Sequence, residues 1–197
     1  MTDNIHKSKC ESCGAMVRSF DTVNISSETK IKVLCSKCYN DSVSQYLGLD
    51  FQHVDFDPIT LNDLDGIPHT FEFRTHIFGS EVSIEALEIR DGQPKGYEFA
   101  VFGDAEEDML QLFRALFEKM KRGLGRKHIE ESEFTEYQIT DGDTVRGRIT
   151  WDDEEEGRVP CLIIDGKEVS WEEFGRILMG YEGFQFKLEI FERYDER

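Results

Sequence analysis

The sequence is poor in cationic residues, and this scarcity argues against one large class of partners. Of its 197 residues, 23 are Lys or Arg and 41 are Asp or Glu, so the formal net charge is −18. Residues 1–50 hold six residues of each sign, and residues 51–197 carry the whole acidic excess. Because binding to a phosphate backbone requires cationic neutralisation, this charge balance disfavours a nucleic-acid partner.

Long apolar runs are also missing. No stretch approaches the ~20 residues of a membrane-spanning helix. The first residues, Met1-Thr2-Asp3-Asn4, show no apolar signal segment. We therefore expect a cytoplasmic protein without a membrane partner. A hydrophobic content of 39%, including 15 Phe, favours a packed core over disorder.

Familiar catalytic motifs are absent as well. The sequence has no phosphate-binding loop, no nucleophile elbow and no His-Glu-x-x-His zinc motif. His128-Ile129-Glu130 and Pro160-Cys161 partly match the zinc deaminases, but Ile164 stands where their second cysteine is required. These absences favour a non-enzymatic protein.

Four of the five cysteines form two Cys-x-x-Cys pairs. Cys10 and Cys13 are followed, after 21 residues, by Cys35 and Cys38. Two residues between thiolates let one tight turn aim both sulfurs at one metal, and Gly14 allows the chain to curl beneath them. The spacing predicts a zinc site with all four cysteines as ligands. Because such a site leaves no position for a catalytic water, the zinc is expected to be structural.

Other interpretations of the cysteines remain open. Two disulfides would need an oxidising compartment, and four unrelated core thiols would need no metal. An iron–sulfur cluster is a further option for a thiophilic site.

The segments around the cysteines predict a compact finger. Residues 15–25 and 30–35 indicate a hairpin joined by residues 26–29, and a helix over 38–47 ends at Gly48. This order of knuckle, hairpin and helix resembles a treble-clef zinc finger. It is most similar to the small zinc-binding domain at the front of ClpX-type unfoldases. The likeness rests on a single set of residues: Cys10, Cys13, Gly14, Cys35, Cys38 and the helix after them.

The resemblance covers about the first quarter of the chain. It implies metal ligation by the four cysteines and a module that docks other proteins. In the unfoldases this module also self-associates, so a homo-oligomer is compatible with it. Nothing in the chain resembles the ATPase that follows the module there.

The rest of the chain predicts an α+β domain of antiparallel strands with helices on one face. We expect domains at 1–50 and 51–197. Expected strands are 69–78, 82–89 (with a bulge near Ala86-Leu87), 97–102, 137–139, 145–151, 158–164, 167–169 and 184–190. Turns are expected at 91–96 and 152–157, and a loop at 124–133.

Two capped helices complete the prediction. The first is expected to start at Asp104, with Glu107 in a capping box, and to stop at Gly123. The second is expected to be capped by Ser170 with Glu173 and to end at Gly180. Its predicted buried side is Trp171, Phe174, Ile177 and Leu178.

Three functional hypotheses follow. The first is a zinc-containing interaction or regulatory protein whose partner is another protein. The second is a hydrolase that uses body carboxylates and His69 or His76. The third is an acidic mimic of nucleic acid. Against the second, we predict a satisfied, half-buried His69, a surface His76 and a Cys161 that is a buried small hydrophobe and not a nucleophile.

Overall fold

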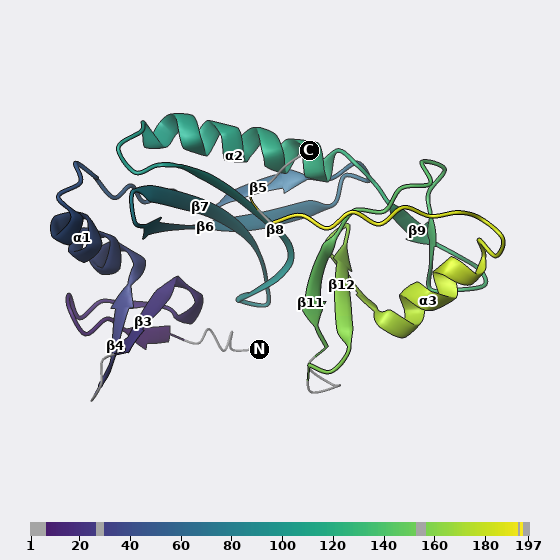
Figure 1. The fold of residues 1–197 in the computed structure, drawn as a ribbon, viewed down its shortest axis with the longest axis horizontal. Coiled ribbons are helices and arrows are strands. Elements are labelled where there is room, and N and C mark those ends of the chain that lie inside the picture. Colours follow the sequence, from purple (N-terminus) through teal and green to yellow (C-terminus); the bar gives the residue numbers. More distant parts are fainter. Residues whose placement is uncertain (1–6, 27–29, 153–156, 193, 195–197) are drawn as a thin grey trace. The chain divides into compact units, whose positions relative to one another are not determined.

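The computed structural model describes residues 7–26, 30–152, 157–192 and 194 (Figure 1). Its described part contains antiparallel sheets and three α-helices, which confirms the predicted α+β class. The chain forms two compact units. The first unit comprises residues 1–60 and 69–120, and the second comprises residues 61–68 and 121–197. The predicted boundary near residue 50 stays a prediction.

The finger at the start of unit 1 is built from two small hairpins and a helix. Strand β1 (Lys7–Lys9) pairs with β2 (Met16–Arg18), and β3 (Thr22–Ser26) pairs with β4 (Ile31–Cys35). A short 3-10 turn, Ser19–Asp21, separates β2 from β3. The expected hairpin is therefore present, but residues 16–18 belong to a second one. Part of the predicted turn, residues 27–29, lies outside the described residues.

Helix α1 (Ser36–Leu47) follows β4 directly and ends, as predicted, at Gly48. Gly48 has φ 69°, and its backbone N–H donates to the Ser44 carbonyl. A left-handed residue at this position satisfies a terminal carbonyl without the strain that a side chain would bring.

The body of unit 1 is a four-stranded antiparallel sheet. Its strands are β5 (Ile59–Asn62), β6 (Pro68–Phe78), β7 (Glu81–Arg90) and β8 (Gln93–Asp104), in that spatial order. The register slips between Leu87 and Ile89, close to the predicted bulge. The predicted turn at 91–96 is shorter than expected. Asp91 and Gly92 both have positive φ, which suits a two-residue hairpin, and β8 starts at Gln93.

Helix α2 (Met109–Leu124) covers one face of this sheet (Figure 1). Its buried side chains include Leu112, Leu116 and Met120. The Phe113 ring lies 5.0 Å from that of Phe73 in β6, measured between centroids. The apolar stripe of the helix is thus a core face, as its spacing predicts.

The predicted start of this helix is wrong. Asp104 pairs with Glu81 and ends strand β8, and its carboxylate accepts from the Glu106 N–H in the following turn. The helix begins at Met109 instead, where the Asp108 carboxylate accepts from the Leu110 N–H. Strand pairing therefore overrides the capping pattern at Asp104. At the other end the helix passes Gly123 and stops at Leu124.

Unit 2 contains two small sheets and a helix. Strands β9 (Ile129–Glu131) and β10 (Tyr137–Ile139) pair, and β11 (Arg148–Trp151), β12 (Pro160–Ile164) and β13 (Lys167–Ser170) form the second sheet. The expectation of a loop throughout 124–133 is wrong at 129–131. The Asp165 carboxylate accepts from the backbone of His128 and Ile129, which anchors this strand. Residues 153–156 of the predicted turn lie outside the described residues.

Helix α3 (Trp171–Met179) confirms the predicted cap. The Ser170 hydroxyl accepts from the Glu173 N–H at 3.1 Å, and Gly180 follows the last helical residue. Its buried side is narrower than expected, because Trp171 is 51% exposed and Leu178 is 46% exposed. One apolar cluster of unit 2 contains the buried residues Ile129, Ile164, Val169 and Ile177.

The predicted strand at 184–190 is not formed. The structure assigns no regular secondary structure to residues 183–192, and their apolar side chains are exposed. None of the described helices is long and apolar enough to cross a membrane.

Candidate metal centre

The first cysteine pair lies in the tight turn between β1 and β2. The Cys10 N–H donates to the Ala15 carbonyl, and the Gly14 N–H donates to the Cys10 carbonyl. Gly14 has φ 76°, which a residue with a side chain rarely adopts. Local backbone hydrogen bonds therefore shape this knuckle and aim both sulfurs to the same side.

The second pair lies where β4 passes into α1. Cys35 is the N-cap residue of α1, and its sulfur accepts from the Cys38 N–H at 3.5 Å. The two pairs are held together by the strand beside them, since the Glu11 N–H donates to the Val33 carbonyl. A small apolar cluster that includes buried Leu34 packs against the site.

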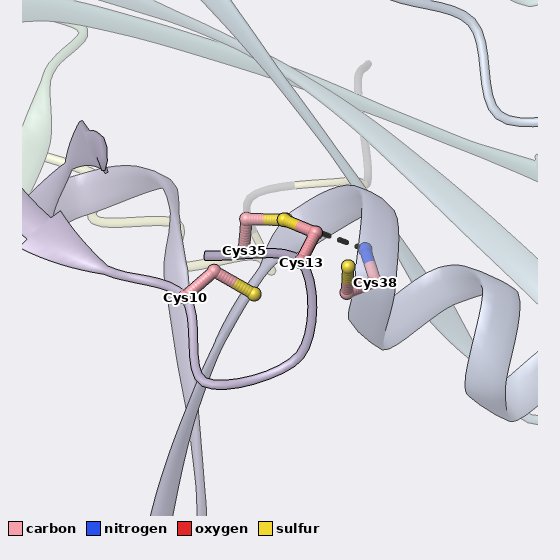
Figure 2. A group of neighbouring side chains, drawn as sticks. All are labelled: Cys10, Cys13, Cys35 and Cys38. Atoms are coloured by element: carbon pink, nitrogen blue, oxygen red, sulfur yellow. Dashed lines mark hydrogen bonds between the residues drawn. The ribbon is translucent and has the colours of Figure 1, made fainter. Parts of the chain in front are cut away.

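The four sulfur atoms converge (Figure 2), and all of them lie within 4.8 Å of one another. The sulfurs of Cys13 and Cys35 are 3.9 Å apart, far beyond the ~2.05 Å of a disulfide bond. A tetrahedron with zinc–sulfur bonds of about 2.3 Å has sulfur atoms about 3.8 Å apart. The arrangement therefore fits a metal ion held by four thiolates, as the spacing of the cysteines predicts.

The pKa values of the thiols show why positive charge is needed at this site. Burial opposes ionisation of Cys10, but the backbone around Cys13, Cys35 and Ser12 outweighs it and lowers the pKa of Cys10 to about 6. Burial raises the pKa of Cys35 to about 12, and it also raises the pKa of Cys38. A cation is needed to ionise the last two, so metal binding would release protons.

A buried polar network connects the finger to strand β6. The Asn40 amide donates to the Thr75 carbonyl at 2.8 Å and accepts from the Ile77 N–H at 3.0 Å. The Tyr39 hydroxyl donates to the Ile77 carbonyl at 3.3 Å. These side chains of α1 satisfy backbone groups of β6 as a neighbouring strand would.

The polar face of β6 also contacts the finger. Glu72 forms an ion pair with Arg18, and the Arg74 guanidinium donates to the Phe20 carbonyl at 2.8 Å. Because Glu72 and Arg74 alternate with Phe73, which contacts α2, the finger and α2 lie on opposite faces of the sheet.

His76 belongs to this contact, so the prediction of a surface histidine is wrong. Its Nε2 lies 2.8 Å from the Ser36 hydroxyl, and its ring meets that of Tyr39 edge to face. Burial lowers the pKa of His76 to about 4, with Arg74 adding to the effect. The imidazole is therefore neutral near pH 7.

His69 has hydrogen-bond partners, as predicted, but it is buried and not half-buried, and it lies away from the finger. Its Nδ1 lies 2.8 Å from Oε1 of Glu88, and this oxygen also accepts from Arg90. The other oxygen, Oε2, accepts from the Tyr97 N–H. Seven residues of strand separate His69 from His76, or roughly 23 Å. The two candidate histidines are thus not brought into one site.

Cys161 is half-buried, whereas a buried side chain is predicted. Its thiol lies 3.5 Å from the Val169 carbonyl, and burial raises its pKa. A nucleophilic cysteine needs the opposite shift. The described residues therefore give no support to a catalytic role for this thiol.

Sequence reasoning missed the polar network. Its signal was a polar stripe on the buried side of α1, where Ser36, Asn40 and Ser44 recur every four residues. Such a stripe implies a partner rich in hydrogen-bonding groups, because buried polar atoms need partners.

Three consecutive stretches of the chain match family models. Residues 9–50, 52–125 and 128–195 match the domains of unknown function DUF7685, DUF7686 and DUF7713, respectively. No curated protein and no solved structure matches the chain significantly. The first match contains the four cysteines, and none of the three carries the name of a zinc finger or an unfoldase.

Proposed function

We propose that this chain is a non-enzymatic, cytoplasmic interaction or regulatory protein whose finger is folded around a structural zinc ion. The supporting observation is the closed set of four converging cysteine sulfurs, in which every tetrahedral position is taken by protein. Such a site stabilises the fold of the finger and leaves its outer surface available to bind a partner. Neutral charge in the finger and acidity elsewhere favour a protein partner over nucleic acid.

The finger also exposes large apolar side chains that a partner could cover. Tyr46 at the end of α1 is 89% exposed, Ile31 is 61% exposed and Met16 is 58% exposed. Aromatic residues and methionine are enriched at interfaces between proteins. The resemblance to the docking module of ClpX-type unfoldases supports the same role.

Metal analysis tests the zinc site. Protein purified without chelator should hold one zinc ion per chain, and Cys35→Ser should abolish this content. Cys161→Ser removes a thiol outside the site and should leave the zinc ratio unchanged. Loss of zinc in both variants, or in neither, would contradict the assignment.

Affinity capture from host extract tests the interaction. A protein captured by the intact chain should be lost with Tyr46→Glu and retained with Gln45→Glu, which changes an exposed neighbour. The metal content of both variants must equal that of the parent. Equal capture by both variants would rule out this surface of α1 as the docking face.

A further inference from the structure

The segment after α3 has the pattern of a β-strand, but it pairs with no strand in the part of the chain that the structure describes. Its apolar residues are mostly exposed; the exposed fractions are 74% for Phe184, 90% for Phe186, 73% for Leu188, 73% for Ile190 and 53% for Phe191. Lys187 and Glu189 form an ion pair at 2.6 Å, so side chains two residues apart lie on the same side, as in an extended strand. Within the described part of the chain, no backbone hydrogen bond links residues 185–191 to another segment.

This exposure marks an interaction surface. Contiguous apolar patches larger than a few hundred Å² are rare on monomers and indicate binding sites. On one face of two such paired segments lie Phe184 and Phe186 of each copy, four phenylalanines that bury about 600–1,000 Å² at about 150–250 Å² each. Leu188 and Ile190 on the same face bring this towards the ~1,200 Å² at which specific interfaces begin. The segment therefore carries enough apolar surface for a partner, and its sequence indicates which one.

The order of charges makes the segment complementary to itself. If two copies run antiparallel about an axis at Leu188, each Lys187 stands opposite Glu189 of the other copy, and Phe186 stands opposite Ile190. An axis one residue earlier places Lys187 opposite Lys187, and an axis one residue later places Glu189 opposite Glu189. An axis between residues sets polar side chains against apolar ones. Among these neighbouring registers, the one centred on Leu188 sets charge against opposite charge and apolar against apolar across residues 186–190. Beyond these five residues the match ends, since Gln185 then stands opposite Phe191 and Phe184 opposite Glu192.

We propose that residues 186–190 of two copies of this chain pair as antiparallel β-strands about a two-fold axis at Leu188, so that this segment is a dimerisation site. Symmetric pairing satisfies the backbone groups along one edge of each strand and gathers their apolar side chains on one face.

An isolated two-stranded ribbon is marginal in water and needs cover on its apolar face. Unit 2 exposes further large side chains that can supply it: Ile149 and Trp151 in β11, and Trp171 and Met179 in α3. The assignment does not involve the cysteines, so its outcome is independent of the zinc site.

Charge exchange tests the register. In analytical ultracentrifugation over a dilution series, the full chain should pass from its 22.9 kDa monomer to twice that mass. Lys187→Glu and Glu189→Lys should each weaken dimerisation by about tenfold or more, because two cross-strand pairs turn from attraction to repulsion. The double exchange K187E/E189K should restore it. Arg126→Glu has the same charge change as Lys187→Glu, lies in the same unit outside the segment, and should have no effect.

Symmetric cross-linking gives a second measurement. Leu188→Cys faces its own copy at the axis, within the separation that a disulfide bridges, and should form a covalent dimer on mild oxidation. Gln185→Cys lies three residues from the axis, so its two copies are about 20 Å apart and should not cross-link.

Several results would overturn the proposal. They are a monomer at every concentration, a double exchange no better than the single variants, or equal cross-linking at positions 185 and 188. Slow amide exchange at residues 185–191 in a monomer would assign the segment to its own chain instead.

Discussion

Strand β6 and the segment 184–190 have the same alternation of apolar and polar residues, but the first is part of a sheet and the second is not. In β6, Phe71, Phe73 and Ile77 alternate with Glu72, Arg74 and His76, and strands β5 and β7 lie on either side. In the later segment an equally regular pattern finds no neighbour within the described part of its chain. Alternation therefore indicates that a stretch is suited to be a half-buried strand of a sheet. It does not indicate whether the fold provides a neighbouring strand for it.

The two stretches also differ in what their polar residues contact. Glu72, Arg74 and His76 all meet finger residues, so the supposedly outer face of β6 is an interface. Within the described residues, Lys187 and Glu189 form an ion pair with each other. The polar half of an alternating pattern is thus as informative as the apolar half once its partners are known.

The largest effect is expected from breaking the metal site. Cys35→Ser removes one thiolate, and structural zinc supplies on the order of 10 kcal/mol in isolated fingers. Amide exchange should accelerate at least about a hundredfold across residues 10–48, while α2 and α3 keep their protection, because each packs on its own apolar core. Hydrogen exchange with mass spectrometry measures this. Equal loss of protection in α2 would show that the finger is integral to unit 1, and the boundary near residue 50 would be wrong.

The comparison of the two alternating stretches predicts the next effect. Ile77→Ala in β6 removes a fully buried side chain and should lower the free energy of unfolding by about 2–5 kcal/mol. Leu188→Ala in the later segment should change it by less than about 0.5 kcal/mol in dilute monomer. Urea unfolding of both variants checks the difference. Similar losses would mean that the later segment is packed within its own chain.

A slightly smaller loss is expected at the buried amide. Asn40→Ala leaves the Thr75 carbonyl and the Ile77 N–H without their partner, which should cost about 2–4 kcal/mol of unfolding free energy. Asn24→Ala, an exposed residue of β3, serves as the control and should cost less than about 0.5 kcal/mol. If the two variants unfold alike, the network does not anchor the finger.

The smallest effect concerns pH. The pKa of His76 is about 4 in the folded chain and near its ordinary 6.5 when unfolded, so the unfolded state binds more protons between these values. Stability should fall as the pH drops from 6.5 towards 4, by on the order of 1–2 kcal/mol. His76→Gln should remove this part of the decline. Parallel stability curves for the parent and the variant over that range would contradict the shift.

The sequence by itself determined the features that depend on near neighbours. The two Cys-x-x-Cys turns with Gly14, the stop of α1 at Gly48 and the Ser170 cap of α3 were all predictable, because turn geometry and caps involve residues within a few positions of each other. The main strands of the sheet were also predictable, since their period of two is a local pattern.

Tertiary structure decided everything that depends on a distant partner. Asp104 carries a capping pattern, yet pairing with Glu81 keeps it in a strand. His76 sits among polar residues in sequence, yet α1 buries it, and Asn40 acts through the backbone of a strand that begins 28 residues later. Residues 184–190 have the pattern of a strand, but no strand among the described residues pairs with them. Burial and pairing are properties of two segments at once, so neither segment alone can specify them.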